Sequence, residues 1–245
     1  MGKAAKRKLE RRQATPPLSA EEQEHLGQAM RAVVGALTDA HGADCLLYAS
    51  IGAQTLRQLG YPTARMVCGS AAWRVGSGDP DVISHAIEIN APGDTVFAPN
   101  IEASKAGMFH AWVELGDTVI DFTTGSLRDK AEQLDAMDGG HTQVDWAPEV
   151  LWVDKRAMVP FREVVQSPAA GVFRYQARGD VERVVAREFN ATFQPQTYAA
   201  AVLTAYRSFK AGNQLRVMGV GSDAGDLQTA DMAREASRVR GIRPL

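Results

Sequence analysis

Residues 109–123, Phe-His-Ala-Trp-Val-Glu-Leu-Gly-Asp-Thr-Val-Ile-Asp-Phe-Thr, constrain the fold more than any other stretch of this chain. Apolar residues alternate with others up to Leu115, Gly116-Asp117 supplies a two-residue turn, and the alternation resumes from Thr118. This pattern predicts a β-hairpin. Because a turn of two residues fixes the register, the sequence predicts four pairs: Leu115 with Thr118, Val113 with Ile120, Trp112 with Asp121, and Ala111 with Phe122.

The predicted register sorts the side chains of the hairpin onto two faces, since directly opposed residues share a face and faces alternate along a strand. One face is apolar and is expected to join the core: Ala111, Val113, Leu115, Ile120 and Phe122. The other carries His110, Trp112, Glu114, Val119 and Asp121. His110 and Asp121 become diagonal neighbours, roughly 7–8 Å apart before their side chains lean together. We therefore expect an imidazole oriented by a carboxylate.

Cys45, well upstream of the hairpin, can supply the nucleophile that such a pair serves. It opens a helix predicted over residues 45–59, with Asp44 as the N-cap and Gly60 and Pro62 as the stop. The unpaired N–H groups and the dipole at a helix N-terminus stabilise a thiolate, and a nearby protonated histidine lowers the thiol pKa further. The sequence thus predicts a catalytic triad of Cys45 as nucleophile, His110 as base and Asp121 as the residue that orients the imidazole.

The order of these elements resembles a known grouping. A helix-borne Cys followed by LRQLGYPTARMV, then HAWVEL and then VIDFTTG is similar to the transglutaminase-like branch of the papain-like cysteine-proteinase superfold. Within it, the chain most resembles a bacterial family of unknown function, over roughly residues 44–125. The resemblance implies an α+β, cysteine-proteinase-like fold, in which a helical layer carrying Cys45 packs on an antiparallel β-sheet carrying His110 and Asp121. It implies the same three catalytic residues.

One part of the papain-like pattern differs in this chain. Papain-like enzymes have a Gln shortly before the Cys as an oxyanion donor, but that position is Asp39 here, and no Trp precedes Cys45. The sequence therefore assigns no second oxyanion donor.

His85 is a competitor for the role of the base. The predicted strand Ser84-His-Ala-Ile-Glu-Ile-Asn90 echoes the later His-Ala-Trp-Val-Glu segment. The strand predicted after it, residues 95–98, offers no carboxylate facing the histidine, which favours His110. The alternative for His85 is a strand histidine hydrogen-bonded at the sheet edge. Cys68 follows Met66 and Val67 and is predicted to be a small buried hydrophobic residue.

Charge and helical periodicity divide the chain into three parts. Residues 1–18 form a basic tail, which we interpret as solvated, with contact to nucleic acid or anionic lipid as the alternative. Residues 19–212 are expected to form a single domain, whose first helix starts at a capping box, Ser19 to Glu22, and ends near Gly42. Residues 213–245 are predicted to be a loosely docked or disordered extension.

Composition narrows the classes of function. Two cysteines and a start without an apolar leader favour a reducing cytoplasm, and no run approaches transmembrane length. His141 and Asp145 have no His or Cys partner at metal-ligand spacing, so we expect no metal, and nothing in the sequence calls for a cofactor. No nucleic-acid motif is present, and the expected partner is a small-molecule or peptide substrate with an amide or ester bond. The sequence leaves the oligomeric state open.

Two functions follow from these observations. The first is a thiol-dependent acyl-transfer enzyme, an amide or ester hydrolase or transferase that uses Cys45, His110 and Asp121. The second is a catalytically inactive binding or interaction protein on the same scaffold, which the unassigned oxyanion donor favours. Thiol reactivity separates them, because an inert Cys45 indicates the binding protein.

Overall fold

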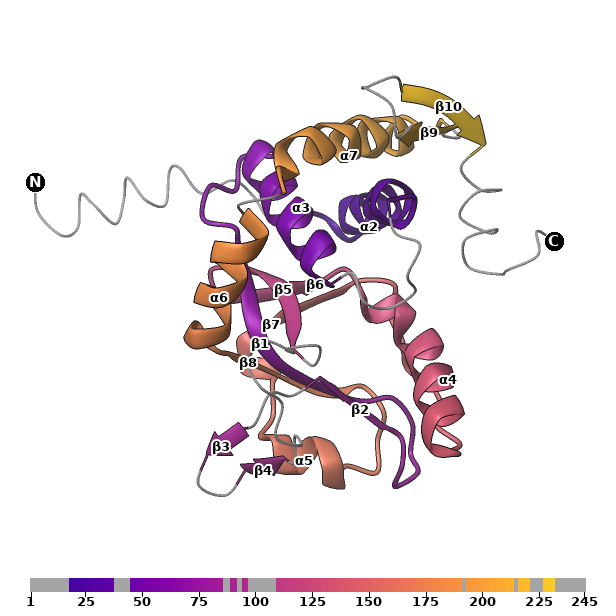
Figure 1. Cartoon of the computed structure of the whole chain (residues 1–245). Helices are drawn as coiled ribbons and strands as arrows, with labels where there is room; N and C mark the ends of the chain where they lie inside the picture. The colour runs from indigo at the N-terminus through magenta and orange to yellow at the C-terminus, as the bar shows by residue number, and fades with distance from the viewer. Residues whose placement is uncertain are drawn as a thin grey trace, which may run out of the picture.

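The structure, a computed structural model, describes residues 18–37, 45–85, 89–91, 94–96, 109–190, 193–213, 216–220 and 227–231. It is a mixed α/β structure with a curled antiparallel sheet and helices (Figure 1). The helices are α2 (Ala20–Gly35), α3 (Cys45–Gln58), α4 (Leu127–Asp138), α5 (Phe161–Gln166), α6 (Gly179–Asn190) and α7 (Pro195–Lys210), with 3-10 turns η2 (Thr124–Ser126) and η3 (Lys155–Ala157). The strands are β1 (Arg65–Arg74), β2 (Val82–His85), β3 (Ile89–Ala91), β4 (Asp94–Val96), β5 (His110–Leu115), β6 (Thr118–Asp121), β7 (Leu151–Asp154), β8 (Val172–Ala177), β9 (Arg216–Val220) and β10 (Leu227–Asp231).

The first described helix, α2, starts where the sequence predicts and ends earlier. The Ser19 hydroxyl accepts from the Glu22 N–H at 3.2 Å, and the Glu22 carboxylate accepts from the Ser19 N–H at 3.0 Å, which confirms the capping box. The predicted end near Gly42 is wrong, because a tight turn from Leu37 N–H to the Val34 carbonyl closes the helix after Gly35. Asp39 and the predicted N-cap Asp44 lie outside the described residues.

Strand β1 organises the main sheet, whose order is β2-β1-β5-β6-β7, with β8 also paired to β1. Residues 65–69 of β1 pair with β5, residues 71–74 with β2, and residues 69–74 with β8. The sequence predicts a strand over residues 62–68, which ends before β1 does. Gly69 instead permits close approach of β8, because a Cβ there would lie 2.0 Å from the Gln176 carbonyl oxygen.

The hairpin of β5 and β6 has the predicted register. Leu115 lies opposite Thr118, Glu114 opposite Val119, and Val113 opposite Ile120, which confirms the two-residue turn. Gly116 adopts a φ of +59°, a conformation that favours glycine. The ladder stops at Val113 and Ile120, so the two outer pairs predicted from the sequence lie beyond the described pairing.

Both faces of the hairpin are buried. The predicted core face packs against α3, with Ala111, Val113, Ile120 and Phe122 in one apolar cluster. The opposite face contributes Trp112 and Val119 to a second cluster that includes Trp73, Leu127 and Phe173. Helices α2, α3 and α7 gather on one side of the sheet, and α5 lies on the other (Figure 1). His110 and Asp121 therefore belong to an interior between layers.

The segment that follows α7 contains a two-stranded sheet that is separate from the main sheet. Strands β9 and β10 pair antiparallel, with Arg216 opposite Asp231 and Val220 opposite Leu227. The sequence pattern of this segment predicts no strand. A similar two-stranded ribbon joins β3 and β4.

Candidate functional site

His110 and Asp121 form a buried ion pair at one end of the hairpin. His110 is the first residue of β5 and Asp121 the last of β6, and both side chains are fully buried. The Nε2 atom of His110 lies 2.8 Å from the Oδ2 atom of Asp121. The contact predicted from the register is therefore present.

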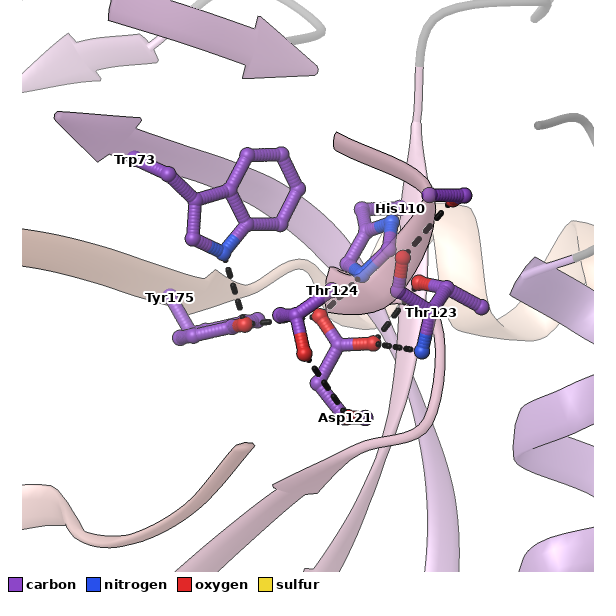
Figure 2. A network of polar contacts seen from close by, with 7 residues as sticks. Trp73, His110, Asp121, Thr123, Thr124 and Tyr175 are labelled. Carbon is purple, nitrogen blue, oxygen red and sulfur yellow. Dashed lines mark hydrogen bonds and ion pairs between the residues drawn. The ribbon is translucent and has the colours of Figure 1, made fainter. Parts of the chain in front are cut away.

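The Asp121 carboxylate accepts hydrogen bonds on both oxygens (Figure 2). Besides His110, Oδ2 accepts from the Tyr175 hydroxyl at 2.7 Å. Oδ1 accepts from the backbone N–H of Thr123 at 2.9 Å and from its hydroxyl at 2.7 Å. Burial alone would raise the pKa of Asp121, but the charge of His110 and these hydrogen bonds outweigh it and lower the pKa. The carboxylate is thus held ionised and in one orientation.

Tyr175 and Trp73 extend this network across the sheet (Figure 2). The indole Nε1–H of Trp73 on β1 donates to the Tyr175 hydroxyl of β8 at 2.8 Å. An indole nitrogen is only a donor, so the tyrosine oxygen accepts from Trp73 and directs its own hydrogen to Asp121. Burial and the negative charge of Asp121 raise the pKa of Tyr175 well above its usual value. Sequence reasoning missed both residues, because only the long-range pairing of β1 with β8 brings them together.

The second ring nitrogen of His110 is left available. Within the described part of the chain, Nδ1 is buried without a hydrogen-bond partner. The Trp112 ring stacks on the imidazole, with ring centroids 6.2 Å apart and an interplanar angle of 16°. The Trp73 ring meets the imidazole edge to face, with centroids 4.9 Å apart and an interplanar angle of 89°. Burial lowers the pKa of His110, but Asp121 and Cys45 outweigh that effect and raise it. The imidazole is therefore fixed through Nε2, with Nδ1 turned away from the carboxylate.

Cys45 is the first residue of α3, as predicted, and its side chain is nearly buried. Burial would raise the thiol pKa, but interaction with His110, the charges of His110 and Lys130, and the Ala111 N–H lower it. Because Nδ1 of His110 makes no hydrogen bond, the Cys45–His110 interaction is better described as electrostatic than as a formed hydrogen bond. Cys68 is completely buried, as predicted, and burial raises its pKa to about 12.

His85 lies beside His110 but lacks its support. The two rings meet edge to face with centroids 5.6 Å apart, and Trp73 contacts both. Burial, with the charges of Lys130 and His110, lowers the pKa of His85 to about 2. No ion pair joins His85 to a carboxylate among the residues that the structure describes. His85 is therefore neutral near pH 7, whereas His110 is the histidine with an acidic partner.

Lys130, in the first turn of α4, is a buried cation that sequence reasoning missed. Its side chain is only 5% exposed, and its Nζ lies 5.6 Å from the centroid of the Trp73 ring. The buried residues Leu127 and Ala131 lie three positions before it and one after it. A lysine on the apolar side of a short helix is the signal that could have identified it.

A separate cavity of about 660 Å³ lies toward the far end of α3. Ser50, Arg57 and Arg65 are among its lining residues, and Cys45, His110 and Asp121 are not. Both arginines are already engaged, Arg57 with the Ala64 carbonyl and Arg65 with Glu114 and Glu182. This cavity therefore does not form part of the candidate site.

The described residues offer neither a metal site nor a membrane-spanning helix. No group of three or more His, Cys, Asp or Glu side chains that could hold a metal ion occurs among them. No helix in the described ranges is both long and apolar enough to cross a membrane.

The chain belongs to the family described as "Protein of unknown function (DUF2026)", which matches residues 20–145. The matched range includes Cys45, His85, His110, Asp121 and Lys130. No curated protein matches the sequence. A solved structure described as "The crystal structure of genomics APC5867" is similar, with a TM-score of 0.57 and 16% identity over 88% of this chain and 92% of that chain. At that identity the similarity shows a shared fold.

Proposed function

We propose that this protein is a thiol-dependent acyl-transfer enzyme, an amide or ester hydrolase or transferase with a transglutaminase-like cysteine-proteinase fold. The observation that carries the proposal is the buried His110–Asp121 pair beside a helix-start thiol whose pKa is lowered. A cysteine that serves only in packing gains from staying protonated, and Cys68 is an example in the same protein. The surroundings of Cys45 instead lower its thiol pKa and favour the thiolate.

The order and packing of the elements support the proposed fold class. Helix α3 carries Cys45 and packs on β5, and His110 and Asp121 come from neighbouring antiparallel strands. These contacts support the cysteine-proteinase-like arrangement that the sequence resemblance implies.

In the first half-reaction, the Cys45 thiolate attacks the carbonyl carbon of an amide or ester, which forms an S–C bond and an oxyanion. The backbone N–H of Cys45 at the helix start is one donor to that oxyanion. As the oxyanion collapses, the C–N or C–O bond breaks, and protonated His110 gives its proton to the leaving amine or alcohol.

In the second half-reaction, water or another acceptor attacks the thioester while His110 takes its proton. The S–C bond then breaks, and Cys45 leaves as the thiolate. Asp121 holds the ring through Nε2, so that Nδ1 is the nitrogen that exchanges protons with the reactants. The hydrogen bonds from Thr123 and Tyr175 fix the carboxylate that does this.

The proposal is tested by limited labelling of the folded protein with iodoacetamide near pH 6, followed by peptide mapping. A thiol with an ordinary pKa of about 8.5 is almost wholly protonated at that pH. We expect Cys45 to be alkylated and Cys68 to be spared. The Cys45→Ser protein should take up no label under these conditions, and the Cys68→Ser protein should react like the wild type. Labelling of Cys68 in preference to Cys45 would overturn the assignment, and an inert Cys45 would favour a non-catalytic binding protein.

A further inference from the structure

Lys130 is tied to the candidate site through the turn that follows Asp121. The Thr123 N–H and hydroxyl bind the Asp121 carboxylate, and the Ser126 hydroxyl donates to the Thr123 carbonyl at 2.7 Å. Helix α4 begins at the next residue and carries Lys130 in its first turn. Thr123 therefore links Asp121 to the start of the helix that carries this lysine.

The Trp73 ring links Lys130 to the two histidines. The ammonium lies 5.6 Å from the ring centroid, within the range of a cation–π interaction. The centroid of the same ring lies 4.9 Å from that of His110 and 5.8 Å from that of His85. Its Nε1–H donates a hydrogen bond to the Tyr175 hydroxyl. An ammonium that is 5% exposed and packed on a fixed indole has little freedom to turn into solvent.

The charge of Lys130 acts on two groups from different elements. It favours the thiolate of Cys45 on α3 and disfavours the imidazolium of His85 on β2. Both effects are those of a positive charge near the sulfur, and an interior of low dielectric strengthens them. His85, being neutral, adds no charge of its own, so the charged groups described beside the thiol are His110, its carboxylate partner Asp121, and Lys130.

We propose that Lys130 makes the site selective for acyl substrates that carry a carboxylate close to the scissile carbonyl. This inference rests on the proposed function, in which the acyl group becomes bonded to the Cys45 sulfur. A carboxylate a few bonds from that carbonyl lies in the positive potential of Lys130 and is stabilised by it. A neutral acyl group gains nothing from the same charge.

Two alkylating reagents test the inference, because iodoacetate and iodoacetamide differ only in the carboxylate. In both reactions the Cys45 thiolate displaces iodide and forms an S–C bond, so the fraction of thiolate cancels in the ratio of the two rate constants. At low ionic strength, we expect the ratio of the iodoacetate rate constant to the iodoacetamide rate constant to exceed that of a free thiol. In Lys130→Met the ratio should fall about tenfold, which is the equivalent of one pKa unit of interaction.

Two further variants serve as controls. Lys130→Arg keeps the charge and should retain the ratio to within about threefold. Lys210→Met removes a surface lysine of α7 that pairs with Glu22 of α2, and this change should leave the ratio unchanged.

The outcomes separate this inference from the proposed function. An unchanged ratio in a folded Lys130→Met protein whose Cys45 still reacts with iodoacetamide overturns the selectivity and leaves the enzyme proposal standing. If Lys130→Met does not fold, the wild-type ratio decides, because a value no higher than that of the free thiol also overturns the selectivity. A wild-type Cys45 that is inert to both reagents overturns the proposed function itself.

Discussion

Replacing Tyr175 with Phe isolates the hydroxyl that supports Asp121. The change removes one donor to Oδ2, the oxygen that also receives the hydrogen bond of His110. It also leaves the Trp73 Nε1–H without its acceptor in a fully buried position. The ring of the residue, and with it the packing on Trp112 and Phe173, is kept.

The magnitude follows from these two losses. A hydrogen bond to a charged group contributes about 1.5–3 kcal/mol, and a buried donor left without a partner costs about 1–3 kcal/mol. Because losses within one hydrogen-bond network are not additive, we expect the free energy of unfolding at pH 7 to fall by about 2–4 kcal/mol, less than the sum of the two. The thiol pKa of Cys45 should not rise, since Asp121 loses a competing donor and becomes a stronger acceptor for His110.

Urea unfolding measures the free energy of unfolding, and titration of the thiolate absorbance measures the thiol pKa of Cys45. Tyr198→Phe is the matched control, because this half-buried tyrosine packs on Phe193 through its ring, which the change keeps, and the change should cost less than about 1 kcal/mol. A loss below about 1 kcal/mol for Tyr175→Phe, or a thiol pKa raised by a full unit, would refute the reasoning.

Two other substitutions probe the site and its support. Asp121→Asn should raise the thiol pKa of Cys45 by about one to two units, at roughly 1.4 kcal/mol each, because an amide cannot stabilise the imidazolium by charge. Since the folded pKa of Asp121 is lowered, its contribution to stability is present above about pH 4 and is lost as the pH falls below that value. The free energy of unfolding of Asp121→Asn, measured with urea, should therefore depend less on pH in acid than that of the wild type. An unchanged thiol titration would count against the orienting role of Asp121. Gly52→Ala places a Cβ 2.5 Å from the Phe122 ring and should destabilise the fold by about 1–2 kcal/mol despite the better helix propensity. Gly35→Ala, whose nearest neighbour lies 3.6 Å away, should be neutral or stabilising in thermal unfolding, and equal effects would argue against the packing of α3 on β5 and Phe122.

The sequence predicted those parts of the site that depend on local rules. A two-residue turn fixes the pairing of β5 with β6, and that register places His110 and Asp121 at the same end of the hairpin. The start of α3 at Cys45 followed from the helix pattern between residues 45 and 59. These predictions needed no knowledge of what covers the sheet.

The sequence did not predict the partners that come from distant strands. Tyr175 reaches Asp121 because β8 pairs with β1, and no periodicity within either strand encodes that pairing. The sequence also gave no sign that the His110 face is covered by a second apolar cluster. Full burial of His110 follows from that cover, so the ring is part of the packing as well as of the chemistry.

The central claim is that His110, and not His85, is the partner of Cys45. The most direct measurement is the rate of Cys45 alkylation by iodoacetamide at pH 6 in His110→Ala and His85→Ala, two equal truncations within one aromatic cluster, after circular dichroism has shown that both fold. Loss of His110 should return the thiol toward its ordinary pKa of about 8.5 and lower the rate by at least about tenfold, while loss of His85 should leave it within about threefold of the wild type. A His85→Ala protein that is silent while His110→Ala still reacts would contradict the account and move the base to β2.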